Sequence, residues 1–437
     1  MKSKKMLGLI IAIVVFAIPV LSYAQETRLG GEFWGRYTNE TAKYKDASGE
    51  YVNKMHKNYF ALDRGYLDFR TKFSETTSAR FTVDIFSTDA SHEYEKYKDV
   101  YTNAQGSVDT LFSEPTKSSV DGAGLKLKYA YVDFANLIPI PDMILSAGLQ
   151  KVYFGSIYDW TYNLIGKAMS DEYKVADSAD YGVTLNGFIP HGLGEYAFGI
   201  YNGEGYKKFG STLKENMDFS YLGNIRITPI AGITIGGSYM QKTLEREESL
   251  KEDKVNYKYQ EQTSIDGIAR LAYGPVDVWA EYIQKDVVYP NKKADEKLFV
   301  DYKASGFSIF PTISLYQFIG YDVQLLGRYD SWEDRDSKEK WEEKNTLPDN
   351  PDHGNVYWKK EKYINDYKLN AITYGVNYNF LHDESFVPKM QVQLNYTTKK
   401  YDAEDPAEGL KNEYTDGNKD SSTLMLQLKW RFSSTIK

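Results

Sequence analysis

The chain has 437 residues, no Cys and a formal net charge of -8, and 42% of its residues are hydrophobic. Beyond its N-terminal segment it contains no run of about 18 apolar residues, which excludes a bundle of transmembrane helices. The acidic balance argues against a nucleic-acid partner, and the lack of Cys excludes a disulfide-stapled scaffold, haem attachment through C-x-x-C-H and any thiolate metal site.

The N-terminal segment has the features of an export signal. Three lysines among the first five residues precede an apolar run from Leu7 to Ile18, and small residues follow up to Ala24. This pattern predicts a secretory signal peptide at residues 1–24, cleaved after Ala24. The alternative is a short N-terminal anchor helix, but the apolar run falls short of a full membrane span.

Apolar and polar residues alternate along many segments of the remaining chain, as expected of strands with one apolar face. The clearest examples are 125–131, 219–227, 276–282, 390–396 and 424–432. In the first of these, the alternation places Tyr129 and Tyr131 on the apolar face, opposite Lys126 and Lys128. The recurrence of the pattern over about 400 residues favours a barrel in a membrane over a soluble sandwich.

The chain contains sixteen segments that we predict to be strands. They lie near 28–37, 63–73, 79–86, 124–134, 143–153, 179–188, 194–201, 217–228, 232–241, 263–273, 276–285, 304–315, 320–330, 366–380, 388–400 and 421–432. The connections alternate between long, charged segments and short turns, and bacterial outer-membrane barrels have this asymmetry. We therefore predict an all-β fold, with residues 25–437 forming one transmembrane antiparallel β-barrel. It would have short periplasmic turns, long extracellular loops and contact with the lipid of a Gram-negative outer membrane.

The twelfth predicted strand, 304–315, contains Pro311, which cannot donate a hydrogen bond to a neighbouring strand. If this segment were a loop, the barrel would have fourteen strands and a smaller bore.

A sixteen-stranded barrel is too wide for its own side chains to fill, so we expect an aqueous channel. The predicted basic pore-lining residues are Arg36, Arg70, Lys72, Arg80, Lys126, Lys128, Arg226, Arg270, Arg328, Lys429 and Arg431. The predicted acidic ones are Glu32, Asp68, Asp84, Asp218, Asp266, Asp277, Glu281 and Asp322. A basic pore wall favours anions. The alternative is that the mixed charges only keep the lumen wet and rigid through ion pairs.

The connection 155–178, between the fifth and sixth predicted strands, is more apolar than the other long connections. Apolar surface in a loop should be packed, so we predict that the segment folds into the barrel and narrows the pore. The alternative is an external loop that covers a neighbouring subunit. The predicted constriction residues are Tyr158, Asp159, Trp160, Lys167, Asp171 and Lys174.

The residues around this loop resemble a known family. The segments Gly148–Lys151, Phe154–Gly155, Asp180–Gly187 and Tyr201–Gly205 are similar to the middle of the phosphate-selective porins of Gram-negative outer membranes. The motif resemblance covers about 60 residues. It implies a sixteen-stranded homotrimeric channel whose third loop folds into the lumen and whose lysines and arginines draw anions through.

We predict no enzymatic function and therefore no catalytic residues. The five histidines lie in predicted loops or turns and form no paired metal-binding spacing, so no metal or other cofactor is expected. None of the predicted strands carries a His that could activate a nucleophile. The predicted function is passive diffusion of small ions and solutes through a porin, with a preference for phosphate-like anions. The alternative is a structural barrel that holds a partner protein.

Overall fold

The computed structural model describes most of the barrel. The described residues are 26–45, 51–88, 98–102, 108–112, 122–137, 140, 142–160, 166–206, 218–251, 254–288, 302–334, 367–383, 388–403 and 419–436. The predicted signal peptide, residues 1–24, lies outside them. Within these ranges, no helix is both long and apolar enough to cross a membrane.

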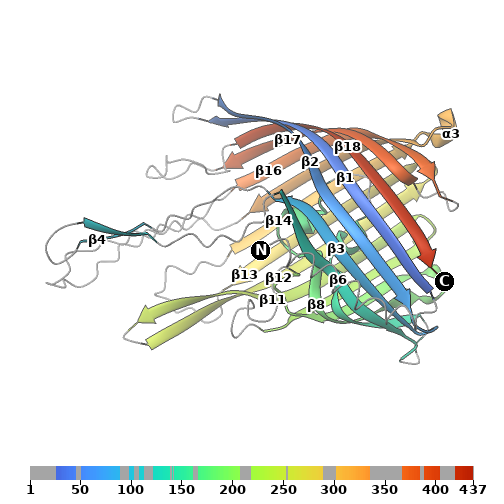
Figure 1. Ribbon diagram of the computed structural model, residues 1–437, viewed down its shortest axis with the longest axis horizontal. Coiled ribbons are helices and arrows are strands. Elements are labelled where there is room, and N and C mark those ends of the chain that lie inside the picture. The colour runs from blue at the N-terminus through green and yellow to red at the C-terminus, as the bar shows by residue number, and fades with distance from the viewer. Residues whose placement is uncertain are drawn as a thin grey trace, which may run out of the picture.

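Sixteen strands close into a single antiparallel barrel (Figure 1). They are β1 (Glu26–Lys45), β2 (Tyr51–Lys72), β3 (Thr77–Thr88), β6 (Gly122–Ala135), β7 (Met143–Lys151), β8 (Ala179–Ile189), β9 (Gly194–Tyr201), β10 (Ser220–Ile230), β11 (Ile233–Lys251), β12 (Lys254–Tyr273), β13 (Val276–Val288), β14 (Tyr302–Ser314), β15 (Val323–Asp334), β16 (Tyr367–His382), β17 (Pro388–Ala403) and β18 (Lys419–Ile436). Each of the sixteen predicted strands corresponds to one of these, so the predicted fold is confirmed. The barrel closes where β1 pairs with β18.

The two ends of the barrel differ. Figure 1 shows the end of β18 and the short helix α3 (Tyr316–Ile319) at one end of the barrel. Two-residue turns at 231–232 and 274–275 connect strands there. The opposite end carries the two-stranded sheet of β4 (Lys98–Thr102) and β5 (Val108–Phe112). Short connections therefore lie at one end of the barrel, and the long connection that carries β4 and β5 lies at the other, as the alternation predicts.

Two predicted loops are partly strand. Residues 242–251 and 254–262 extend β11 and β12 into a long hairpin, and residues 38–45 and 51–62 extend β1 and β2. The sheet β4–β5 also lies in a predicted loop. Segments 38–45 and 242–251 contain few apolar residues, so the alternating pattern that predicts a strand is weak there.

The alternation of faces is that of a barrel in lipid. On β18, Leu426 and Leu428 are exposed on the outside, whereas Gln427 is buried between them on the inside. Inside, Gln427 Nε2 donates to Gln393 Oε1 at 3.3 Å, and Gln393 Nε2 donates to Asn377 Oδ1 at 2.5 Å. Amide side chains on the inner face of β16, β17 and β18 therefore hydrogen-bond to one another.

Pro311 lies within β14, and the alternative of fourteen strands is wrong. The β14–β15 pairing runs from Ala304 to Ile309 and resumes at Thr312, so the ladder is interrupted at the proline. Proline has no backbone N–H to donate, so a strand tolerates it where the hydrogen-bonding ladder is interrupted.

A β-bulge reverses the predicted faces in β6. Thr82 pairs with Tyr129 and Val83 pairs with Leu127, so Lys128 is the extra residue. A one-residue bulge shifts the alternation by one position. Tyr129 faces the lumen, with the Arg80 guanidinium 4.3 Å from the centre of its ring. The prediction that Tyr129 and Tyr131 share the apolar face of Leu125 is therefore wrong.

Replacing Gly148 with valine is expected to weaken the contact between β6 and β7. Gly148 has a φ of 124°, and a Cβ on it would lie 2.4 Å from the carbonyl oxygen of Ala130. A side chain in this conformation costs about 1–3 kcal/mol before the clash is counted. Thermal unfolding followed by circular dichroism should show a lower midpoint for Gly148→Val.

The control is Gly223→Ala, because a Cβ on Gly223 meets only the ring of Phe198, at 3.8 Å. Equal midpoints for the two variants would contradict the expectation.

Candidate functional site

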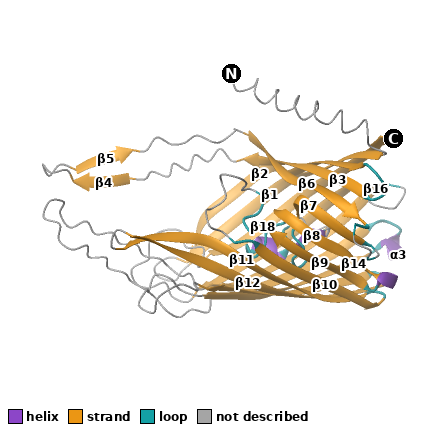
Figure 2. Ribbon diagram, turned by 90° about the horizontal axis from the view of Figure 1, so that it is seen from below, coloured by secondary structure: helices purple, strands orange, loops and turns teal. Residues whose placement is uncertain are grey.

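The barrel encloses a cavity of about 750 Å³. Strands β1, β2, β3, β6, β16, β17 and β18 form one side of it. A segment that connects β7 to β8 inside the barrel forms much of the other side. We call residues 152–178 the inward loop; the structure describes 152–160 and 166–178 of it. Figure 2 shows helical turns within the ring of strands, and the inward loop supplies η1 (Ile157–Asp159) and α2 (Met169–Glu172).

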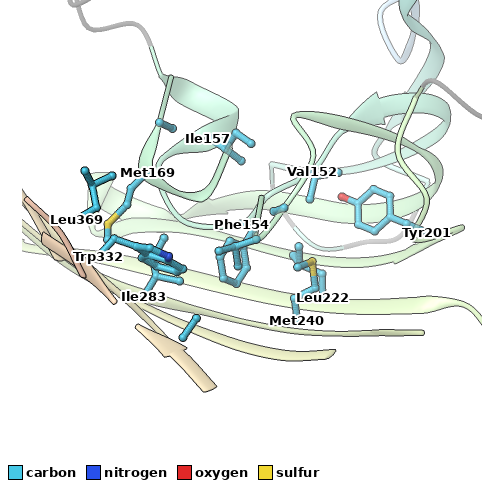
Figure 3. Close-up of a cluster of buried hydrophobic side chains, with 14 residues drawn as sticks. Val152, Phe154, Ile157, Met169, Tyr201, Leu222, Met240, Ile283, Trp332 and Leu369 are labelled. Carbon is cyan, nitrogen blue, oxygen red and sulfur yellow. The ribbon is translucent and has the colours of Figure 1, made fainter. Parts of the chain in front are cut away.

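Apolar packing holds the inward loop against the barrel wall. Phe154 and Met169 of the loop are fully buried, in a cluster that includes Ile283 of β13 and Trp332 of β15 (Figure 3). The ring of Tyr173 stacks on Trp332 with centroids 4.6 Å apart. Burying a large apolar side chain contributes about 1.5–3 kcal/mol. The apolar residues of this loop are therefore packed on the inner wall, and the alternative of an external loop is wrong for the described part.

Hydrogen bonds fix the start of the loop. Glu281 of β13 accepts from the Ser156 backbone N–H at 2.9 Å and from the Ser156 hydroxyl at 2.8 Å. The Gly155 N–H donates to the Ser238 hydroxyl at 2.9 Å. Gly155 has a φ of 53°, and a Cβ on it would lie 2.4 Å from Glu281 Oε1. The loop therefore approaches this carboxylate as closely as its backbone allows.

Arg226 of β10 clamps the same part of the loop. Its guanidinium donates to the Gly155 carbonyl oxygen at 2.6 Å and to Asp159 Oδ2 at 2.6 Å. It also lies 3.3 Å from Glu195 and 4.5 Å from the centre of the Tyr158 ring. Arg226 is inside the barrel as predicted, but it is buried under the loop and does not line the cavity.

The second half of the loop reaches across to β15 and β17. Arg328 donates to the Lys167 carbonyl oxygen at 2.7 Å. Lys399 of β17 forms an ion pair with Glu172 at 2.8 Å. The described parts of the loop therefore contact the wall from β9 to β17. At its end, Ser178 accepts a hydrogen bond from Lys128 of β6. The cavity remains on the side of β1, β2 and β3.

The cavity lining is more basic than acidic. Seven predicted residues line it, namely Arg36, Arg80, Lys126, Lys128, Arg328, Lys429 and Arg431. Arg64, Lys151, Lys167 and Lys399 line it as well, which makes eleven basic residues. The acidic lining residues are Glu32, Asp63, Asp68, Asp84, Asp159, Asp171, Glu172 and Asp330, eight in all. The described lining therefore has an excess of three positive charges.

Four predicted residues lie away from the cavity. Besides Arg226, these are Arg70, Lys72 and Arg270. Arg70 and Arg270 face the inside near the end of the short turns, where they pair with Asp68 and Asp277 at 2.7 Å. Lys72 is exposed at the end of β2. These strand-end positions lie beyond the loop, so alternation alone did not distinguish them from the cavity wall.

Of the predicted constriction residues, five line the cavity: Tyr158, Asp159, Trp160, Lys167 and Asp171. Lys174 does not line it. Trp160 donates from its indole to the Gly166 carbonyl oxygen at 3.0 Å, which closes the described ends of the loop on each other.

Comparison with known proteins supports the fold. No family model matches the chain, and no curated protein matches it. Among solved structures, OmpT of Vibrio cholerae aligns with a TM-score of 0.52 at 9% identity, over 92% of this chain and 98% of that one. An anion-selective porin from Comamonas acidovorans aligns at 0.51 and 12% identity, over 93% and 100% of the two chains. The outer-membrane channel DcaP of Acinetobacter baumannii aligns at 0.50 and 13% identity, over 93% and 97%.

The chain has the fold of an outer-membrane porin. A closed barrel with an apolar exterior leaves no strand edge unpaired in lipid. The predicted location in the outer membrane of a Gram-negative bacterium is confirmed. The resemblance to phosphate-selective porins in particular stays a prediction.

Three basic residues of this porin-fold cavity were not singled out from the sequence: Arg64, Lys151 and Lys399. Arg64 is an even number of positions from Asp68 and Arg70 and therefore falls on the same face of its strand. Lys399 is related in the same way to Gln391 and Gln393. Extending the alternation would have placed both in the lumen. Lys151 ends β7 at the start of the inward loop, where no alternation applies.

The ion pair between Glu172 and Lys399 is expected to break only in acid. Burial raises the pKa of the Glu172 carboxyl, but Lys399 beside it holds this pKa below its usual value. A carboxyl with a lowered pKa keeps its contact above the ordinary value and loses it as pH falls through the lowered one. The difference in conductance between the unmodified protein and Glu172→Gln should therefore stay constant from pH 7 to 5 and disappear below about pH 4.

Glu172→Gln should show the acid conductance already at pH 7. Asp171→Asn, which removes the same charge from the same helix, is the control. Loss of this difference near pH 6 would contradict the assignment to Glu172.

Proposed function

We propose that the chain is a passive outer-membrane channel for small ions and solutes, with a preference for anions. The observation that carries this proposal is the excess of three positive charges in the described lining of a lumen narrowed by the inward loop. A basic wall in a confined space attracts anions and repels cations. Exposed charges are screened over about 10 Å at 0.1 M salt, so the effect is concentrated where the walls approach each other.

Most of the excess comes from lysines. Within the described chain, no carboxylate lies within 4.0 Å of the Lys151 amine, whereas Arg36 and Arg80 pair with Asp63 and Asp68 at 2.8 and 2.7 Å. Paired charges keep the wall wet and ordered, and lysine amines without such a partner keep their attraction for a passing anion. This distinction favours anion selectivity over a purely structural role for the lumen charges.

Reversal potentials in planar bilayers test the proposal. With a potassium chloride gradient across a membrane that contains the purified protein, the potential should have the sign that reports chloride as the more permeant ion. A potential of the opposite sign would end the anion proposal, and the absence of any conductance would end the channel proposal. Replacing chloride with phosphate then tests the finer preference for phosphate-like anions.

We also propose that residues 1–24 are a signal peptide, which is cleaved on export, and that residues 25–437 form one barrel domain. We propose further that the protein assembles as a homotrimer. OmpT of Vibrio cholerae, which shares the fold, has been solved in a trimer form. Chemical cross-linking in native outer membranes should give a band at three times the monomer mass.

We propose no catalytic role for this barrel. Among the described residues, no group of three or more His, Asp or Glu could hold a metal ion. A sleeve around a partner protein is disfavoured because the inward loop occupies the lumen that the partner would need.

A further inference from the structure

Two carboxyl groups, those of Asp266 on β12 and Glu281 on β13, lie together under the start of the inward loop. They are diagonal neighbours on the inner face, since Asp266 pairs with Ile283, two positions beyond Glu281. Both side chains are buried. A Cβ on Gly155 would lie 2.4 Å from Glu281 Oε1 and 3.2 Å from Asp266 Oδ2. The backbone of the loop therefore covers the pair and separates it from the water of the lumen.

The donors around this pair reach every carboxyl oxygen except one. Ser156 donates from its backbone N–H to Glu281 Oε1 and from its hydroxyl to Glu281 Oε2. The Ser238 hydroxyl donates to Asp266 Oδ1 at 3.5 Å. Asp266 Oδ2 is buried, and no donor of the described residues bonds to it. A buried carboxylate oxygen without a donor is costly, so this atom needs a proton of its own.

The cation that acts on Asp266 is already paired. Arg226 of β10 supplies this positive charge, but its guanidinium donates to Asp159 at 2.6 Å and lies 3.3 Å from Glu195. Among the described residues, Asp266 itself forms no ion pair. One guanidinium that faces two other carboxylates does not neutralise a third, so an ionised Asp266 would be a poorly compensated buried charge.

The other strands that pack on the pair supply no further balance. Arg328 of β15 acts on Glu281, but it pairs with Asp330 at 2.8 Å. Ser238 and Ser308, the ladder partners on β11 and β14, are neutral. If both carboxyl groups of the pair were ionised, they would repel each other in a buried place, where charge is poorly screened.

We propose that Asp266 and Glu281 share one proton, and that this proton helps to hold the inward loop on the wall. The two groups hydrogen-bond to each other, which two carboxyl groups can do only when one of them is protonated. The proton is on Asp266 Oδ2, because both oxygens of Glu281 already accept from Ser156. Loss of the proton places a second negative charge under Gly155, and the loop must lift before water reaches that charge.

The shared proton makes the width of the pore depend on pH. The anchored loop keeps the proton, whereas a detached loop exposes Asp266 to water, where a carboxyl ionises near pH 4. Above about pH 5 the anchored state therefore binds one proton more than the detached state. Each increase of one pH unit should raise the ratio of detached to anchored loop by up to about tenfold, until the pair itself ionises.

Single-channel recordings between about pH 6 and 9 test this dependence. In the unmodified protein, the occupancy of the larger current level should rise with pH. Asp266→Asn replaces the protonated oxygen with an amide that donates at every pH, so the occupancy in this variant should stay low throughout. Groups elsewhere in the lumen titrate in both proteins, so the difference between the two reports Asp266.

The matched control is Asp277→Asn, which removes a carboxylate from the same inner wall. Asp277 lies on β13 near the short turns, where it pairs with Arg270 at 2.7 Å. Because Asp277 is remote from the start of the loop, its variant should keep the pH dependence of the unmodified protein. Loss of the dependence in both variants would overturn the assignment to Asp266.

Infrared spectroscopy tests the proton without relying on current. At neutral pH, the difference spectrum between the unmodified protein and Asp266→Asn should contain the carbonyl band of one protonated carboxylic acid. Asp277→Asn should not remove this band, because Asp277 is ionised beside Arg270.

The outcomes distinguish this inference from the channel function on which it rests. The same pH dependence in the unmodified protein and in Asp266→Asn overturns the role of the proton in holding the loop, and absence of the acid band overturns the proton itself. Both results leave the channel proposal standing. A complete lack of conductance overturns the channel proposal instead, and the infrared band then still decides whether the pair holds a proton.

Discussion

Replacing Glu281 with alanine is expected to detach the start of the inward loop from the barrel wall and to raise the single-channel conductance. The substitution removes both hydrogen bonds that Ser156 donates, at 2.9 and 2.8 Å. Each contributes about 0.5–1.5 kcal/mol. Their loss should raise the population of the detached loop by about 5- to 150-fold. Single-channel recordings should show a larger mean current and more frequent transitions between levels.

The control for Glu281→Ala is Asp286→Asn on the same strand. Asp286 bonds to its neighbour Gln284 and is not in contact with the described part of the loop. Arg226 still holds the Gly155 carbonyl oxygen in Glu281→Ala, so the barrel should retain its thermal stability while the pore widens. An unchanged conductance in Glu281→Ala would mean that the loop does not limit the current.

Reversing the charge of two lysines in the cavity lining is expected to reverse the ion selectivity of the channel. Lys126→Glu combined with Lys151→Glu leaves nine basic and ten acidic residues in a lining that has eleven and eight. The sign of the excess charge changes, so the reversal potential in a salt gradient should change sign as well. The effect should be largest at low ionic strength, where screening is weakest.

The matched control is Lys72→Glu combined with Lys368→Glu. Both lysines are exposed and neither lines the cavity. This pair changes the charge of the whole protein by the same amount, so a reversal in both double variants would show that selectivity follows the total charge and not the lumen.

The bilayer explains why the strands could be predicted so fully from the sequence. Every barrel strand keeps one face in lipid, and that requirement imposes alternation on segments such as 424–432. Alternation is weak in the polar segments 38–45 and 242–251, so the outer parts of β1 and β11 were predicted to be loops. It also fails at Lys128, because the bulge there depends on how β3 and β6 pair and leaves no mark on the sequence.

The site was predictable in composition but not in contacts. The apolar content of 155–178 indicated that the loop is packed, and alternation placed Arg226 and Glu281 inside the barrel. Their role as the clamp and the anchor of the loop depends on how a long connection folds back on the wall, which no local pattern encodes. The loop covers some of the inward-facing residues of the strands, so only the remaining ones line the described cavity.

Closure of the barrel by β1 and β18 has a consequence for how the protein is made. The ladder pairs Thr27 with Ile436 and continues to Tyr44 and Lys419, and Arg36 donates to Gln427 at 2.7 Å across 391 positions of chain. Contacts between residues so distant in sequence form slowly, because a long chain must be brought together before they are made. Until β18 has been synthesised and delivered, β1 and β17 remain open strand edges that can pair with other chains. Pairing of β18 with both neighbours therefore removes the remaining open edges of the barrel and, with them, this route to aggregation.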